Sequence, residues 1–160
     1  MKTESTLRHC PICASEVDMP VDTLGSMAAA PRFIAKAVRD APAEGGPGWS
    51  PPEVAAHLAD TEVVTGWRLR QILAEDEPTL QPYDQEKWAA ALRYGERNTD
   101  LALEAFAAAR QANLELLRLL SDRDWERGYL HLEYGRQTLR VKIQHLSDHD
   151  LAHLRQICGG

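Results

Sequence analysis

Histidine is the residue type in this sequence with the clearest capacity for chemistry. Three of the six histidines, His145, His149 and His153, follow one another at intervals of four residues. Residues four apart on an α-helix lie on the same face. A further histidine, His57, lies in a separate stripe that otherwise carries apolar and threonine side chains. Imidazoles repeated at this spacing, with one more supplied by another helix, are typical of a metal site.

The apolar stripe of the C-terminal helix places His149 and His153 where a helical bundle would place leucine. A single buried histidine is usually satisfied by an ordinary hydrogen bond. Three are costly to bury, because each ring has two nitrogens to satisfy and resists charging away from water. A metal removes this cost by taking one nitrogen of each ring. We therefore predict that His57, His149 and His153 bind a divalent metal, with zinc first and nickel, iron or manganese as alternatives.

The elements that must position these rings are helices, because Ala, Leu, Arg, Glu and Gln dominate and alternating strand patterns are scarce. Ser50, Pro51 and Glu53 form a capping box at the start of one helix. Pro31 is expected to kink or break another. We expect long helices over residues 22–39, 51–75, 98–120 and 139–157, a short helical piece over 84–94, and a hairpin-like excursion near 129–135.

The heights of the histidines along their helix axes predict the topology of the bundle. At ~1.5 Å of rise per residue, His57 lies about 9 Å inside the start of its helix, and His153 and His149 lie roughly 6 and 12 Å inside the end of theirs. These levels match if the second and fourth helices are antiparallel. The second and third are then parallel and need a long crossover, which residues 76–97 provide. The prediction is an all-α, up-down-down-up four-helix bundle over residues 21–160.

Other polar and aromatic residues lie close to the predicted ligands in the sequence. Asp60 and Asp150 are the candidate catalytic residues, because ligating imidazoles usually donate their other N–H to a carboxylate or carbonyl. Each is alternatively a solvated helix charge. Trp49 and Tyr83 are expected to line the cleft and bind a cofactor, although Trp49 also suits a hydrophobic staple before the helix cap. No role is assigned to His131.

A second group of chemically capable residues lies in the N-terminal tail, residues 1–20. There Cys10 and Cys13 form a CxxC motif beside His9. Such a pair can be half of a zinc knuckle or a redox pair. Only Cys158 remains elsewhere, so a four-cysteine site cannot form within the chain. We interpret the motif as part of a tail outside the bundle, with a metal or redox role as the alternative.

Two motifs of this sequence resemble those of the DinB/YfiT-like superfamily: WSxxEVxxHLADxE over residues 49–62 and HxxxHDxxHLxQI over residues 145–157. The resemblance implies an up-down-down-up bundle, often a homodimer, with a divalent metal held in a cleft at one end. Its ligands correspond to His57, His149 and His153. It also implies either a metal-dependent hydrolase or an S-transferase that uses a low-molecular-weight thiol such as bacillithiol, mycothiol or glutathione.

Three protein ligands leave a tetrahedral metal one open position, as in catalytic sites and unlike closed structural ones. That position suits a water that attacks an ester or amide, or a thiolate that attacks an electrophile. The sequence thus predicts a metal-dependent hydrolase or thiol S-transferase acting on a small electrophilic substrate. The alternative is a stress-related bundle that binds a metal or small molecule without catalysis.

The composition limits which partners the protein can bind and in which cellular compartment it is expected. The 160 residues include 18 Lys and Arg against 24 Asp and Glu, a net charge of −6, which disfavours nucleic-acid binding. No stretch approaches about 18 consecutive apolar residues, and the first twenty lack the apolar core of a signal peptide. Three cysteines do not make a disulfide framework. We expect a cytoplasmic protein that binds neither nucleic acid nor a membrane.

Overall fold

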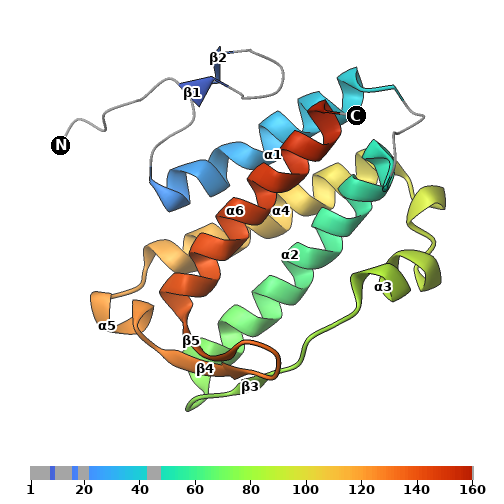
Figure 1. Ribbon diagram of the computed structural model, residues 1–160. Helices are drawn as coiled ribbons and strands as arrows, with labels where there is room; N and C mark the ends of the chain where they lie inside the picture. The colour runs from blue at the N-terminus through green and yellow to red at the C-terminus, as the bar shows by residue number, and fades with distance from the viewer. Residues whose placement is uncertain (1–7, 10–15, 18–21, 43–47, 160) are drawn as a thin grey trace.

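The structure is a computed structural model, and it describes residues 8–9, 16–17, 22–42 and 48–159. Four long helices make up most of these residues: α1 (Thr23–Asp40), α2 (Pro51–Ala74), α4 (Thr99–Arg118) and α6 (Leu139–Cys158). Figure 1 shows α1 and α6 running in one direction and α2 and α4 in the other. The predicted up-down-down-up four-helix bundle is therefore confirmed, with the long crossover between α2 and α4.

Short elements fill the connections. The crossover carries β3 (Thr79–Leu80), α3 (Gln85–Ala91) and the 3-10 helix η1 (Tyr94–Glu96). Between α4 and α6 lie α5 (Asp122–Trp125), β4 (Gly128–His131) and β5 (Gly135–Thr138). Strand β4 pairs antiparallel with β5, and parallel with β3 in the register Thr79 to Leu130. Near the N-terminus, β1 (Arg8–His9) pairs antiparallel with β2 (Glu16–Val17). The predicted hairpin is present, and β3 joins it as a third strand.

Polar caps fix where the long helices begin, and thereby the level of every side chain on them. In the predicted capping box the backbone N–H of Ser50 donates to Glu53 Oε2 at 2.8 Å. The side chains of Asp22, Asn98 and Thr138 accept a backbone N–H at the starts of α1, α4 and α6. Each cap satisfies a donor that the first helical turn leaves free.

The buried core has two apolar clusters with a polar layer between them. One cluster includes Ile34, Leu58 and Phe106, and the other lies nearer the sheet and includes Leu69 and Leu139. Helices α2, α4 and α6 supply this polar layer with residues that lie between their contributions to the two clusters. The buried polar residues of the layer are Glu62, Thr65, Arg110, Asn113, Ser147 and Asp150. Burial of such groups is tolerated only when they are hydrogen-bonded.

Helix α1 runs unbroken through Pro31, which differs from the kink or break expected there. Proline has no backbone N–H, so the carbonyl of Met27 one turn earlier loses its helical donor. Arg110 of α4 supplies the missing hydrogen bond, with Nη1 2.9 Å from that carbonyl. The defect in one helix is thus repaired by another.

The predicted boundary between tail and bundle stays a prediction, because Cys10 and Cys13 lie outside the described residues. Among the helices that the structure describes, none combines the length and apolar character needed to cross a bilayer.

Candidate metal centre

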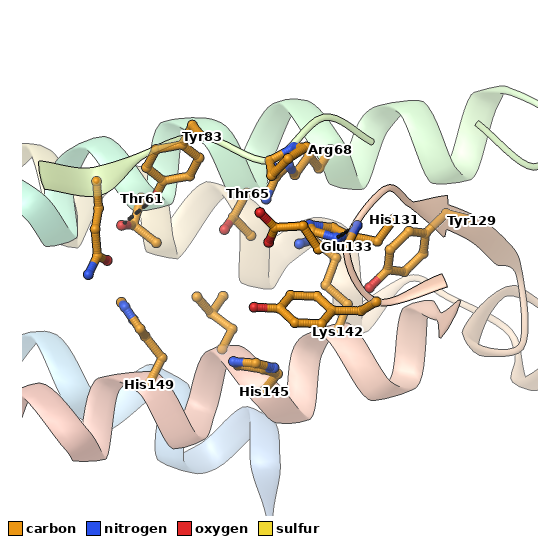
Figure 2. A pocket seen from close by; sticks show the side chains of 14 residues that line it. Thr61, Thr65, Arg68, Tyr83, Tyr129, His131, Glu133, Lys142, His145 and His149 are labelled. Carbon is orange, nitrogen blue, oxygen red and sulfur yellow. Dashed lines mark hydrogen bonds between the residues drawn. The ribbon is translucent and has the colours of Figure 1, made fainter. Parts of the chain in front are cut away.

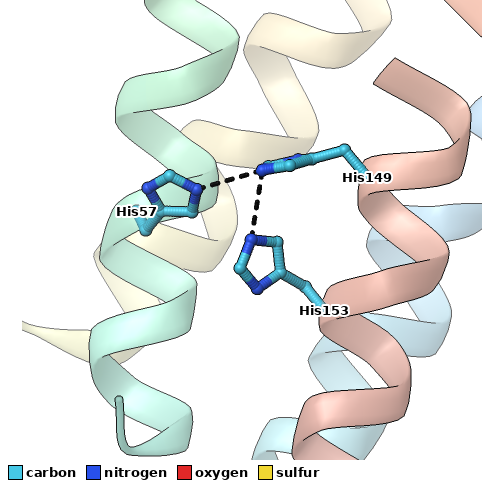
Figure 3. Close-up of side chains that lie close together, drawn as sticks. All are labelled: His57, His149 and His153. Carbon is cyan, nitrogen blue, oxygen red and sulfur yellow. Dashed lines mark hydrogen bonds between the residues drawn. The ribbon is translucent and has the colours of Figure 1, made fainter. Parts of the chain in front are cut away.

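The three histidines predicted as ligands meet between α2 and α6 (Figure 3). His57 lies in the second turn of α2, and His149 and His153 face it from the second half of α6. The Nε2 atoms of His57 and His149 are 3.2 Å apart, and those of His149 and His153 are 3.1 Å apart. Candidate ligand atoms of all three rings lie within 4.8 Å of one another. The antiparallel α2 and α6 bring the rings to one level, as the height argument predicted.

These separations fit a divalent metal. Two nitrogens bound ~2.0–2.1 Å from one tetrahedral zinc lie roughly 3.3 Å apart. The observed spacing is close to that value. A ring nitrogen either donates or accepts one hydrogen bond, so His149 Nε2 cannot satisfy both of its imidazole neighbours. A shared cation that accepts all three lone pairs resolves this conflict.

The rings are held in the form that binds metals. Burial, with a smaller contribution from the neighbouring rings, lowers the pKa of His57 and of His149 to about 3. Burial also lowers the pKa of His153. The imidazoles are therefore neutral at pH 7, and a metal can bind without displacing protons from them.

The expected hydrogen bonds from the imidazole N–H groups to the carboxylates differ from what the structure shows. Both oxygens of Asp60 accept from Arg97 Nη1 at 2.9 Å. Asp150 is buried and accepts two hydrogen bonds from Arg110, at 2.7 and 3.0 Å. Successive residues on a helix point about 100° apart, so Asp150 faces α4 while His149 faces α2. A catalytic role for either aspartate stays a prediction.

Other residues orient the rings. Gln156 Oε1 lies 2.9 Å from Nδ1 of His153, a contact that its position three residues further along α6 allows. The Trp49 ring lies 4.7 Å from the ring of His57 and is stacked parallel to that of His153 at 6.4 Å. Nδ1 of His57 and of His149 is buried and has no hydrogen-bond partner in the described part of the chain.

Tyr83 also lies beside the histidines, although it comes from the crossover. Its hydroxyl is 3.2 Å from Thr61 Oγ1, which is itself 3.3 Å from His57 Nε2. The structure thus brings both predicted aromatic residues, Trp49 and Tyr83, to the cluster. Their binding of a cofactor stays a prediction.

A cavity of about 400 Å³ adjoins the cluster (Figure 2). It begins at Thr61, Tyr83 and His149 and extends toward Arg68 and Lys142 near the sheet. No role was predicted for His131 and His145 or for the two cations, although all four line this cavity. Spacing offered a signal on α6, since Lys142, His145 and His149 recur at intervals of three and four residues. No spacing in the sequence indicated a role for Arg68, because its place at the cavity depends on the crossover that packs beside it.

An up-down-down-up bundle with three converging imidazoles and an adjoining cavity defines a class of helical bundles with a candidate metal centre. The sequence profile of the DinB superfamily matches residues 24–157, and the chain belongs to that family. The predicted resemblance is thereby confirmed.

The similar proteins include curated relatives and a solved structure. A "Putative metal-dependent hydrolase" of Oceanobacillus iheyensis is 32% identical over 114 residues, covering 69% of this chain and 66% of the relative. One of the same name from Bacillus cereus is 30% identical over 110 residues, covering 69% and 63%. The match thus spans just under two thirds of these relatives. The structure of YfiT from Bacillus subtilis, a four-helix bundle, aligns with a TM-score of 0.73 and 24% identity over 84% of this chain and 83% of that one, which shows the shared fold.

Proposed function

We propose that this protein is a metal-dependent hydrolase of small electrophilic substrates, with His57, His149 and His153 holding a divalent metal. The observation that carries the proposal is the convergence of three imidazoles, one buried and two half-buried, at one end of a cavity. The names of the relatives support it. Zinc is the first candidate, because neutral imidazoles suit it, and nickel, iron or manganese are the alternatives.

The side chains around the histidines have distinct tasks in this proposal. A bound divalent metal would supply a water of lowered pKa as the nucleophile. Thr61 and Tyr83 line the cavity beside His57, so their hydroxyls are placed to hydrogen-bond a polar group of the substrate there. Trp49 packs against two of the rings and keeps them in position.

The same arrangement suits a low-molecular-weight thiol as the nucleophile, which would make the protein an S-transferase. A metal favours the thiolate over the thiol. The cavity of about 400 Å³ is within the range of ~300–1,000 Å³ typical of small-molecule sites, so it has room for such a thiol. A bundle that binds its ligand without catalysis is the remaining alternative.

Metal content tests the proposal first. Elemental mass spectrometry on protein purified without a polyhistidine tag should find near-stoichiometric metal in the wild type. Both His57→Ala and the double variant His149→Ala/His153→Ala should lose it. His145→Ala is the matched control, because His145 lies on the same helix and lines the cavity without joining the cluster. Metal retained in both cluster variants would overturn the assignment of the ligands.

Activity assays then separate the chemistries. The metal-loaded protein is assayed for hydrolysis of 4-nitrophenyl esters and for consumption of glutathione with 1-chloro-2,4-dinitrobenzene. Ester hydrolysis that is lost in His149→Ala supports the hydrolase. Thiol consumption without hydrolysis identifies the S-transferase, and bound metal with neither activity identifies the binding bundle.

We also propose that the protein forms a homodimer. Val63 and Trp67 lie one turn apart on α2 and are 66% and 65% exposed, so they form an adjacent apolar pair on the surface of the helix. Light scattering after size-exclusion chromatography should give twice the chain mass of 17.9 kDa. Trp67→Glu should shift the protein to a monomer, and a monomeric wild type would contradict the proposal.

A further inference from the structure

The cavity is chemically different at its two ends. Near the histidines it is lined by neutral rings and hydroxyls, whereas the end near the sheet carries two cationic side chains, Arg68 of α2 and Lys142 of α6 (Figure 2). Both are half-buried. In the part of the chain that the structure describes, neither forms a salt bridge, although several exposed arginines do. The two cations therefore lack a carboxylate partner of their own.

The contacts of the two cations aim them at the cavity. Arg68 donates a hydrogen bond to the carbonyl of Gln81, and its guanidinium lies 5.7 Å from the ring centre of Tyr83. The ammonium of Lys142 lies 5.9 Å from the ring centre of Tyr129. These contacts hold both groups against the cavity wall and leave further N–H donors of each without a hydrogen-bond partner among the described residues. An aromatic face offsets part of the cost of burying a cation, and an anion offsets more of it.

The charges at the sheet end of the cavity also favour an anion there. Burial, and secondarily the charge of Arg68, lowers the pKa of Lys142 to about 8. The one carboxylate among the lining residues is Glu133, which is exposed on the turn between β4 and β5. His131 also lines this end, and burial and Arg68 lower its pKa while Glu133 opposes them. Two cations against one exposed carboxylate leave the cavity with a positive end.

Helical spacing gives the distance between the two ends. Lys142 precedes His149 by seven residues on α6, which is about 10 Å along the axis. Arg68 follows Thr61 by the same interval on α2. A molecule that reaches from the histidines to the cations is therefore elongated.

We propose that the cavity binds an elongated organic anion, whose carboxylate lies between Arg68 and Lys142 and whose reactive group lies about 10 Å away at the histidines. The reactive end of this inference rests on the proposed function, whereas the carboxylate end rests on the two cations alone. The carboxylate belongs either to the electrophilic substrate or to a thiol that attacks it, and the two sources share the same recognition chemistry.

Equilibrium binding to the metal-free protein tests the carboxylate end without any activity. The probes are 6-phenylhexanoate and its uncharged counterpart 6-phenylhexanamide, compared by isothermal titration calorimetry. Charge-assisted hydrogen bonds should make the wild type bind the carboxylate about tenfold more tightly than the amide. Lys142→Met and Arg68→Met should each remove most of this preference. Lys142→Arg should retain it, because the charge is kept.

Arg140→Met is the matched control, since Arg140 is an exposed cation on the same helix that pairs with Glu126 outside the cavity. It should bind the probes as the wild type does. Equal binding of acid and amide by the wild type would overturn the inference, and so would a preference unchanged by both cavity variants. Because each cation is tested from a different helix, one variant that fails to fold leaves the other informative.

Two further comparisons identify the source of the carboxylate. One uses the mono-4-nitrophenyl ester of azelaic acid against 4-nitrophenyl nonanoate, and the other uses glutathione against its dimethyl ester with 1-chloro-2,4-dinitrobenzene. In one of the two pairs the free acid should have the higher kcat/KM, and Lys142→Met should remove that difference. That pair shows which reactant carries the anion. A protein that prefers the carboxylate yet binds no metal would refute the proposed function alone. A metal-loaded protein without the preference would refute this inference alone.

Discussion

Two polar clusters share the helices α2 and α6 of this bundle, and they differ in how their atoms are satisfied. In the first, Arg110 donates to the carboxylates of Asp150 and Glu62, and Asn113 donates to Glu62. Cations, anions and amides there complement one another. In the second, three imidazole nitrogens of the histidine cluster point at one another. These are like groups, and they cannot all pair among themselves.

The difference separates a cluster that is complete within the protein from one that we propose to be completed by a metal. Buried polar groups that satisfy one another stabilise one arrangement of the helices, whereas groups that converge without a complement mark the place of a group from outside. Residue 149 and residue 150 are neighbours in the chain, yet one belongs to each cluster. Two adjacent residues of α6 thus face different clusters, one of which stabilises the bundle and one of which is proposed to bind the metal.

Breaking the Arg110 cluster should have the largest effect on stability. Arg110→Met would leave the buried carboxylates of Glu62 and Asp150 without their cation, at a cost of about 3–5 kcal/mol. Urea denaturation of the metal-free protein measures this. Arg118→Met, an exposed position on the same helix, should change the free energy of unfolding by no more than about 0.5 kcal/mol. A loss below 1 kcal/mol at position 110 would contradict the structural role.

Adding a metal should stabilise only the histidine cluster. With zinc at 100 to 1,000 times its dissociation constant, the wild type should gain about 3–4 kcal/mol. His149→Ala should gain almost nothing, whereas Arg118→Met should gain as much as the wild type. Thermal denaturation with and without zinc measures the gain. An equal gain in His149→Ala would place the metal elsewhere.

Acid should destabilise the metal-free protein through the same rings. The folded-state pKa of His57 and His149 is lowered to about 3, below the ordinary value near 6.5, so the unfolded chain takes up protons first as the pH falls. Asp150 opposes this, because burial raises its folded pKa to about 6 and protonation favours the folded state. The net loss from pH 7 to 5 should be about 2 kcal/mol.

Urea denaturation at several pH values checks this balance. The double variant His57→Asn/His149→Asn should lack most of the acid loss, since Asp150 is then opposed only by His153, whose pKa burial also lowers. A wild type that becomes more stable from pH 7 to 5, as Asp150 alone predicts, would show that the rings titrate alike in both states.

The half-buried pair of Asp60 and Arg97 should show the smallest effect. Asp60→Asn should cost about 0.5–1 kcal/mol, because the pair is partly solvated. If Asp60 is catalytic, as its position three residues after His57 predicted, the same variant lowers kcat far more than that loss explains. Steady-state kinetics compared with Arg97→Met, which removes the same ion pair, separates the two roles.

Local signals made the long helices and the level of the histidines predictable from the sequence. The capping box at Ser50 and the four-residue spacing on α6 both act within a few residues. The pairing of Arg110 with Asp150 was out of reach, because it joins residues 40 apart that each resemble an ordinary helix charge. Strand β3 was missed for a similar reason, since two residues carry no periodicity and depend on β4 for their pairing.

Pro31 ties the backbone of α1 to a distant helix. The carbonyl of Met27 receives its donor from Arg110, 83 residues further along the chain. In an isolated α1 peptide only water could supply that donor. Docking of α4 replaces that water with an internal hydrogen bond, so the backbone of α1 is satisfied within the protein only in the assembled bundle.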